Sequence, residues 1–269
     1  MIRAFYGTNV NPFASEHIEL LNHQQEVYDI MQVHSHQGGL CLLMGEPGTG
    51  KSIIKDTIHQ QATKMVKVVN IGRTLHTYFN TIKILCHAFK IEYSGTSFAL
   101  EKRLIEEAYN LNRIGKILIV IIDDAHLMDM HTLRKLRLLF EDFPKNHNII
   151  LVGQPPLIHN IALRVNDDIK SRVTYSTILP KLNPDDMELF ILKELDAAGL
   201  PHNTFTEDAL ALIIRSCDGI LRKARNLCLS CMVGAVRDQK KTIDIDIVNS
   251  VLIQPHWRIE KDLGHFLQG

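Results

Sequence analysis

Short apolar segments alternate with amphipathic segments over the first two thirds of the chain. The apolar segments have the length and β-branched content of strands, and they lie at residues 39–44, 65–70, 117–122, 148–152 and 173–179. Helical spacing appears between them, at residues 52–62, 77–89, 96–111 and 130–143. The run 117–122 is apolar throughout, which is typical of a strand buried on both faces of a parallel sheet. The alternation predicts a doubly wound, five-stranded parallel sheet of the α/β class.

The pattern changes after Pro180, where strand-like segments stop. Helical spacing continues at residues 184–198, 206–217, 222–236 and 244–252, with Gly and Pro residues in the gaps. These segments predict a small all-α domain. We therefore expect an α/β domain over residues 1–180, with an N-terminal segment 1–38, followed by a helical lid domain over 181–254 and a tail over 255–269.

Composition narrows the class of protein. The 269 residues carry 30 Lys and Arg against 30 Asp and Glu, and this balance excludes a histone-like protein held on nucleic acid by its total charge. The cysteines are odd in number, at 5, and lie among apolar neighbours, so we expect reduced core thiols. We find neither an apolar run of about 18 residues nor a secretory signal pattern. We therefore expect a cytoplasmic protein that does not enter a membrane.

The strongest chemical motif follows the first predicted strand and precedes a helix. It reads G-x-x-x-x-G-K-S and consists of Gly45, Glu46, Pro47, Gly48, Thr49, Gly50, Lys51 and Ser52. In such a P-loop, glycines let the backbone wrap around phosphate oxygens, while backbone N–H groups and the helix N-terminus supply positive dipoles. Lys51 would reach the β- and γ-phosphates, and Ser52 would ligate Mg²⁺. The motif predicts a nucleotide site that uses ATP and Mg²⁺.

A pair of carboxylates follows the third predicted strand. Asp123 and Asp124 end the apolar run and precede Ala125 and His126, which is the pattern of a Walker B site. Asp123 would hold Mg²⁺ through water. Asp124 would orient or deprotonate the water that attacks the γ-phosphate. The two aspartates therefore predict hydrolysis of ATP to ADP and phosphate.

Three further polar residues have positions that suggest roles at the γ-phosphate. Gln154 follows the fourth strand and is placed like a sensor 1 residue, between the two Walker segments. Arg172 precedes the fifth strand and is placed like an arginine finger that a subunit offers to its neighbour, with Arg164 as a rival and a surface ion pair as the alternative. Arg222 opens a helix of the small domain and is placed like a sensor 2 residue, while Arg225 is a weaker candidate.

These motifs together resemble the AAA+ superfamily and, more narrowly, the ExeA/TniB/TnsC-like ATPases. The narrower resemblance rests on Phe5-Tyr6-Gly7, Asn11-Pro12-Phe13, His23, Ala125-His126-Leu127, Leu138-Leu139, Leu151-Val152-Gly153-Gln154-Pro155 and Gly219-x-x-Arg222. It covers about residues 3 to 253. It implies a nucleotide between the sheet edge and the helical domain, with adenine against His23. Asp124 departs from the Glu usual in the family, and its shorter side chain predicts slow hydrolysis.

The resemblance implies partners as well as chemistry. Many members of this family form ATP-dependent homo-oligomers, bind duplex DNA without sequence preference and recruit or activate a transposase at a target site. We therefore expect a DNA-bound ring or filament that regulates a transposase or a related recombination protein. A signalling switch of the STAND type and a secretion ATPase like ExeA are the alternatives. We expect further domains from the first and a membrane partner from the second.

Candidate DNA contacts are basic and polar residues in two regions. One follows the second strand, where ring-forming relatives track the phosphate backbone, and the other is the helix after the Walker B site. The candidates are Arg73, Lys83, Lys90, Thr96, Arg134, Lys135 and Arg137. An ordinary solvated helix face is the alternative at each position, because no base-reading motif accompanies them. With zero net charge, we expect few DNA contacts per subunit, summed over an oligomer.

Overall fold

The chain folds into two compact units in a computed structural model that describes residues 1–14, 19–72, 77–92 and 94–257. The described residues between 20 and 180 form an α/β unit, and those of 1–19 and 181–257 form a helical unit. We expected the N-terminal segment to lie wholly with the α/β domain, but its described residues 1–14 group with the helices. The cause is packing: the ring of Phe13 meets Phe205 edge-on at 6.3 Å between centroids, and Lys241 donates a hydrogen bond to the Phe5 carbonyl.

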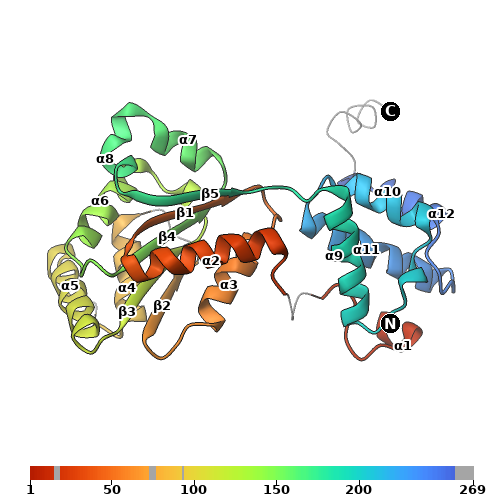
Figure 1. The fold of residues 1–269 in the computed structure, drawn as a ribbon, viewed down its shortest axis with the longest axis horizontal. Helices are drawn as coiled ribbons and strands as arrows, with labels where there is room; N and C mark the ends of the chain where they lie inside the picture. Colours follow the sequence, from red (N-terminus) through yellow and green to blue (C-terminus); the bar gives the residue numbers. More distant parts are fainter. Residues whose placement is uncertain (15–18, 73–76, 93, 258–269) are drawn as a thin grey trace. The chain divides into compact units, whose positions relative to one another are not determined.

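One parallel sheet forms the centre of the α/β unit. Within the described residues it has five strands in the order β2-β3-β4-β1-β5 (Figure 1). The strands are β1 (Gly39–Gly45), β2 (Val66–Ile71), β3 (Ile117–Ile122), β4 (Asn148–Gly153) and β5 (Val173–Leu179). The predicted fold class, a five-stranded parallel sheet followed by a helical region, is confirmed.

Helices cover both faces of this sheet (Figure 1). They are α2 (Asn22–Gln37) and α3 (Lys51–Gln60) on one face, and α4 (Tyr78–Ala88), α5 (Ser97–Arg113) and α6 (Met130–Glu141) on the other. The short helices η1 (Ala125–Leu127), α7 (Pro156–Ala162), η2 (Arg164–Asn166) and α8 (Asp167–Lys170) lie in the connections. Of all helices in the described segments, none has the length and apolar character that crossing a membrane requires.

Alternation along β1 explains why two separate cores form. Leu40 and Leu42 belong to the cluster shared with α4, α5 and α6, whereas Cys41 and Leu43 belong to the cluster shared with α2 and α3. Successive strand residues point to opposite faces, so one short apolar run anchors helices on both sides.

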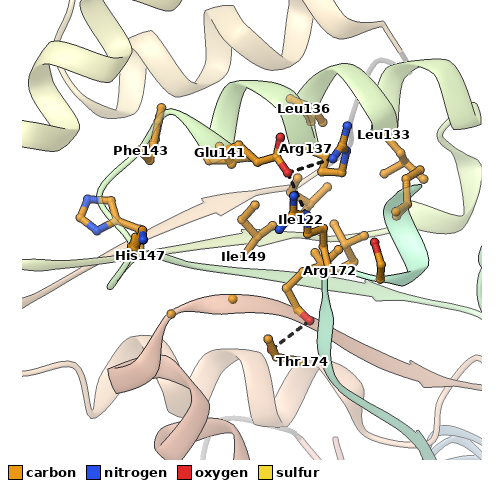
Figure 2. A pocket seen from close by; sticks show the side chains of 18 of the residues that line it. Ile122, Leu133, Leu136, Arg137, Glu141, Phe143, His147, Ile149, Arg172 and Thr174 are labelled. Carbon is orange, nitrogen blue, oxygen red and sulfur yellow. Dashed lines mark hydrogen bonds and ion pairs between the residues drawn. The ribbon is translucent and has the colours of Figure 1, made fainter. Parts of the chain in front are cut away.

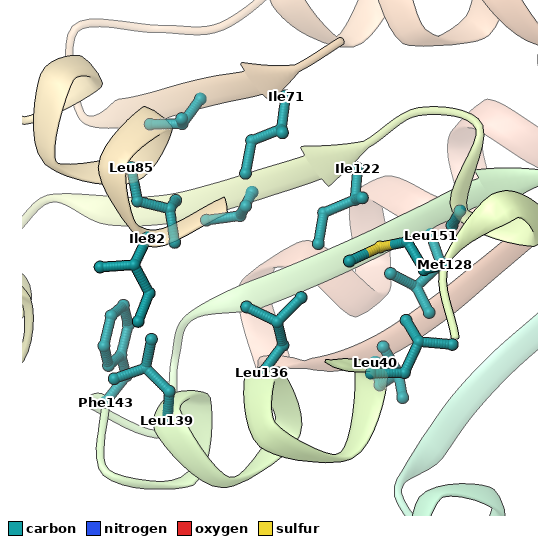
Figure 3. Close-up of a cluster of buried hydrophobic side chains, with 14 of the residues drawn as sticks. Leu40, Ile71, Ile82, Leu85, Ile122, Met128, Leu136, Leu139, Phe143 and Leu151 are labelled. Carbon is teal, nitrogen blue, oxygen red and sulfur yellow. The ribbon is translucent and has the colours of Figure 1, made fainter. Parts of the chain in front are cut away.

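The larger core fixes the strands that end at the candidate site. Figure 3 shows Ile71, Ile122 and Leu151 of the sheet among side chains from the helices, including Leu136 of α6 and Ile82 of α4. Each of these five side chains is at most 3% exposed. Deleting a buried leucine or isoleucine side chain from such a core costs about 2–5 kcal/mol. The packing therefore holds the ends of β1, β3 and β4 in a fixed relation.

The helical unit has its own core. It contains α1 (Ile2–Tyr6), α9 (Pro184–Ala197), η3 (His202–Thr204), α10 (Glu207–Cys217), α11 (Leu221–Arg237), α12 (Ile245–Leu252) and η4 (Pro255–Trp257). Side chains cap three of these helices at their N-termini: Asn183 accepts from Asp186 N–H, Thr206 from Ala209 N–H and Asp244 from Ile247 N–H.

Gly219 closes the turn between α10 and α11. Its φ of +70° lies in the left-handed region, and a Cβ added there would lie 2.5 Å from the Leu182 carbonyl oxygen. Its carbonyl also accepts a hydrogen bond from Leu182 N–H at 3.0 Å. This turn therefore requires glycine, both for its backbone conformation and for the close approach of residue 182.

The Gly219→Ala variant should be less stable than a matched variant, Gly199→Ala. Gly199 has the same φ of +70°, but nothing lies within 4 Å of an added Cβ. Gly199→Ala should cost about 1 kcal/mol from backbone strain alone, and Gly219→Ala at least about 2 kcal/mol more. Urea unfolding monitored by circular dichroism measures both values. Equal losses for the two variants would contradict the proposed steric role.

Candidate nucleotide site

The P-loop joins the carboxyl end of β1 to the start of α3. Gly48 and Gly50 have φ values of +87° and +100°, which turn the backbone N–H groups of the loop inward. The Thr49 hydroxyl donates to the Glu46 carbonyl at 2.9 Å and closes the loop on itself. Lys51 and Ser52 are then the first two residues of α3. The loop thus has the local geometry of a phosphate cradle at a helix N-terminus.

Lys51 lies folded over this loop. Its Nζ donates to the carbonyls of Gly45 and Glu46, each at 2.8 Å. Both acceptors are neutral backbone groups, which an ammonium exchanges readily for charged phosphate oxygens because charge-assisted hydrogen bonds are stronger. The side chain therefore lies within the loop where a bound triphosphate would meet it.

The carboxylate of Asp123 lies beside α3, close to the P-loop. Its Oδ2 accepts a hydrogen bond from Lys55 Nζ at 2.7 Å, and its Oδ1 accepts from Asp124 N–H at 2.9 Å. Lys55 follows Ser52 by three positions and therefore lies on the same side of the helix. This ion pair brings the Walker B carboxylate to the helix face that begins with Ser52.

Asp124 has an uncommon backbone conformation. Its φ and ψ are +51° and +31°, in the left-handed region, and its side chain is exposed. Aspartate tolerates this conformation better than most residues, and such strain tends to occur at functional sites. The turn directs the chain from β3 into η1 and leaves the Asp124 carboxylate at the sheet edge.

Sheet order places Gln154 between the two Walker segments. β4 pairs with β1 on one side, with Met44 opposite Gly153, and with β3 on the other, with Ile122 opposite Leu151. Gln154 follows β4 directly, so it emerges at the same edge as the P-loop and Asp123. That arrangement is what a polar sensor of the γ-phosphate requires, and the role itself remains a prediction.

The donor set suits Mg²⁺. Ser52 and Asp123 offer hard oxygen ligands, and Mg²⁺ typically takes one or two protein groups while waters and substrate phosphates complete its octahedron. Among the described residues, no group of three or more His, Cys, Asp or Glu side chains is arranged to hold a metal alone. Ser52 and Asp123 would therefore hold the ion together with the nucleotide, and the ion would neutralise phosphate charge during hydrolysis.

Helix α2, which the sequence pattern did not predict, packs beside the site. His23 lies in its first turn. The Tyr28 hydroxyl donates to Gln61 Oε1 at 2.7 Å and ties α2 to the end of α3. Val27, Tyr28 and Met31 share the apolar face that the helix buries, and this spacing is the signal that could have revealed it. Adenine contact by His23 remains a prediction.

Arg172 lies at the amino ends of the strands, whereas the P-loop lies at their carboxyl ends. It directly precedes β5, and the β5 register pairs Val173 with Leu40 and Leu179 with Gly45. Figure 2 shows its guanidinium meeting Glu141 of α6, with 2.9 Å between Nε and Oε1. The Arg172 side chain is 60% exposed. The surface ion pair that we named as the alternative is therefore present, and such a pair contributes at most about 1 kcal/mol.

Arg222 and Arg225 of α11 have different environments. Arg222 is exposed at the second position of the helix. Arg225 pairs with Glu194 at 2.7 Å, both side chains being 13% exposed, and its guanidinium lies 5.2 Å from the centre of the Phe190 ring. Arg225 is therefore bound into the core of the helical unit, while Arg222 is available for a ligand.

The candidate DNA residues on α6 already have partners within the chain. Arg134 donates to both oxygens of Asp168, at 2.7 and 3.2 Å, and thereby lowers the Asp168 pKa. Arg137 donates to Glu141 at 2.9 Å. The Lys135 ammonium lies 5.4 Å from the centre of the Tyr78 ring. The two arginines therefore brace α6, and a DNA contact by any of these residues remains a prediction.

The other DNA candidates follow β2. Arg73 lies outside the described residues. Lys83 lies 4.4 Å from the centre of the Phe79 ring, and Lys90 is exposed just past the end of α4, with a φ of +58°. Thr96 accepts from Ala99 N–H and caps α5. Their roles in DNA binding remain predictions.

Fold and site together are those of an ATPase with the P-loop AAA+ fold. A P-loop follows β1, a carboxylate pair follows β3, and a strand with a polar residue at its end lies between them. Residues 33–161 match the family described as AAA domain.

Known proteins resemble the chain beyond that domain. The general secretion pathway protein A of Aeromonas hydrophila is 26% identical over 258 residues, which are 92% of this chain and 47% of that protein. The chain thus spans about half the length of this curated relative.

Solved structures share the fold. Cdc6p from Pyrobaculum aerophilum superposes with a TM-score of 0.70 and 16% identity over 87% of this chain and 68% of that one. The Aeropyrum pernix ORC1 protein in complex with DNA gives 0.66 and 14% identity over 88% and 67%.

The Asp124→Asn variant should bind ATP but hydrolyse it slowly. Asparagine tolerates the left-handed conformation and has nearly the same size, but it cannot take a proton from water. We expect kcat to fall about 10²- to 10⁴-fold with little change in nucleotide affinity. Phosphate release and binding of a fluorescent ATP analogue measure the two quantities, with exposed Asp56→Asn on α3 as the control. Normal turnover in Asp124→Asn would exclude this carboxylate as the base.

Alanine variants should separate the two arginines of α11. Arg225→Ala leaves Glu194 in the core without its ion-pair partner and should cost about 3–5 kcal/mol of unfolding free energy. Arg222→Ala removes an exposed side chain and should leave stability within about 0.5 kcal/mol while lowering ATP turnover. Thermal unfolding and a turnover assay on both proteins test the assignment. Full turnover in a stably folded Arg222→Ala protein would refute the sensor role.

Proposed function

We propose that this protein is an ATPase that assembles into an oligomer on duplex DNA in its ATP state and regulates or recruits a transposase or related recombinase. Hydrolysis dissolves the assembly. The position of Arg172 is the observation that supports the proposed oligomer. Five residue steps lead from Leu40, which pairs with Val173 next to Arg172, to Gly45 at the P-loop, and this separation corresponds to about 17 Å along the strand.

That distance exceeds the reach of an arginine side chain. Arg172 therefore serves the γ-phosphate of a neighbouring subunit and not that of its own. Its ion pair with Glu141 is no obstacle, because an exposed pair is cheaply exchanged for a phosphate partner. Each active site is then complete only between two copies, which makes ATP turnover depend on assembly.

Support for DNA comes from two directions. A relative of the same fold, the Aeropyrum pernix ORC1 protein, is described in complex with DNA. The sequence motifs resemble those of transposition ATPases, which act on DNA. Because the net charge of the chain is +0, each subunit contributes few phosphate contacts, and useful affinity arises only from many subunits on one duplex.

A secretion or envelope-assembly ATPase is the second candidate. The similarity to general secretion pathway protein A extends over 92% of this chain and favours that reading. The two candidates differ in their partners: the first requires a recombination protein and the second an envelope protein. Affinity purification from the native cell, followed by mass spectrometry, distinguishes them by which partner is retained.

Mixing two inactive variants tests the trans arrangement. Lys51→Ala subunits should not bind ATP but still carry Arg172. Arg172→Ala subunits should bind ATP but lack the arginine. Each alone should have little ATPase activity, whereas an equimolar mixture should recover a substantial fraction, because some interfaces combine an intact P-loop with an intact arginine. The control is the double variant, which carries both Lys51→Ala and Arg172→Ala in every subunit. Absence of recovery in the mixture would refute the trans role.

DNA binding should require ATP and should fall steeply with salt. Anisotropy of a labelled duplex with a nonhydrolysable ATP analogue should report tight binding for the native protein and weak binding for Lys51→Ala. Each phosphate contact adds about 0.9 to the negative slope of log K against log salt. Equal affinity for unrelated duplex sequences is expected. Failure to bind DNA with the analogue present would contradict the proposal.

A further inference from the structure

Lys55 forms an ion pair with Asp123, the carboxylate that we predict to bind the metal. Its Nζ lies 2.7 Å from Asp123 Oδ2. The pair is largely shielded, with side chains 15% and 24% exposed, so its Coulomb attraction is stronger than that of a surface pair. With Oδ1 accepting from Asp124 N–H, both oxygens of Asp123 have partners.

Lys55 and the P-loop lysine have different partners. Lys51 meets backbone carbonyls within the P-loop, whereas Lys55 is one helical turn farther on and meets the Walker B carboxylate. A second lysine at this place puts a full positive charge where a divalent cation would use the same carboxylate. Two cations then compete for one anion.

We propose that Lys55 is a positioning residue that holds Asp123 in the absence of metal and sets the affinity of the site for Mg²⁺. Binding of Mg²⁺ with nucleotide requires the ammonium to give up the carboxylate. A lysine suits this exchange because its charge is carried on a flexible stem and is well hydrated once released. The inference rests on the ATPase site and is independent of the DNA and transposase partners.

A Lys55 that competes with the metal and a Lys55 that is purely structural predict opposite changes in Mg²⁺ binding when the lysine is removed. If the pair only braces α3 against β3, removing Lys55 should weaken folding and, through disorder, weaken Mg²⁺ binding as well. If Lys55 competes with the metal, removing it leaves a partly buried carboxylate without a counter-ion, which should lower the stability of the metal-free protein and strengthen Mg²⁺ binding. The two properties then move in opposite directions.

Variants at position 55 test this sign. Lys55→Met removes the charge and keeps the stem, Lys55→Gln removes the charge and keeps a hydrogen-bond donor, and Lys55→Arg keeps the charge. The exposed Lys64→Met is the matched control for loss of a lysine. The readouts are thermal unfolding without metal and the Mg²⁺ concentration that gives half-maximal binding of a methylanthraniloyl-labelled ATP.

Lys55→Met and Lys55→Gln should unfold at lower temperature without metal, and their half-maximal Mg²⁺ concentration should fall about three- to thirty-fold. Lys55→Arg and Lys64→Met should resemble the native protein. An unchanged or higher Mg²⁺ requirement in the two neutral variants would overturn the proposal, and Lys55→Gln decides the matter if Lys55→Met does not fold. If the native protein shows no DNA-dependent assembly while the neutral variants still show the Mg²⁺ shift, only the proposed function is refuted.

Discussion

The parallel pairing of β4 with both β1 and β3 is the constraint on which the site depends. It places the carboxyl ends of three strands at one edge, so that the P-loop, Gln154 and Asp123 emerge side by side. The alternating side chains of β1 anchor helices on both faces, and the dense core around Leu136 and Leu151 prevents the strands from sliding. A slip of one residue would move the candidate site residues away from one another.

The pairing of β5 with β1 places Arg172 at the other end of the strands. Arg172 lies at the amino end of β5, about 17 Å along the strands from the P-loop. One sheet therefore presents the phosphate-binding groups at one edge and the proposed activating arginine at the other. If Arg172 acts as we propose, this division makes a single subunit incomplete and links ATP hydrolysis to contact between subunits.

Much of this could be predicted from the sequence, because local patterns carry it. The apolar runs marked the strands, and P-loop spacing located Lys51 and Ser52 at the start of a helix. The packing of residues 1–14 with the helical unit could not be predicted, because it depends on long-range contacts such as that of Phe13 with Phe205. The pairing of Lys55 with Asp123 was missed for the same reason: 68 positions separate them, and only the fold brings them together.

In the proposed function, ATP completes the enzyme by bringing subunits together. Sedimentation velocity with a nonhydrolysable ATP analogue, with and without a duplex, measures this most directly. The account predicts small species without nucleotide, large assemblies with the analogue and DNA, and loss of those assemblies when the analogue is replaced by ADP. A protein that sediments as the same small species under all of these conditions would contradict it.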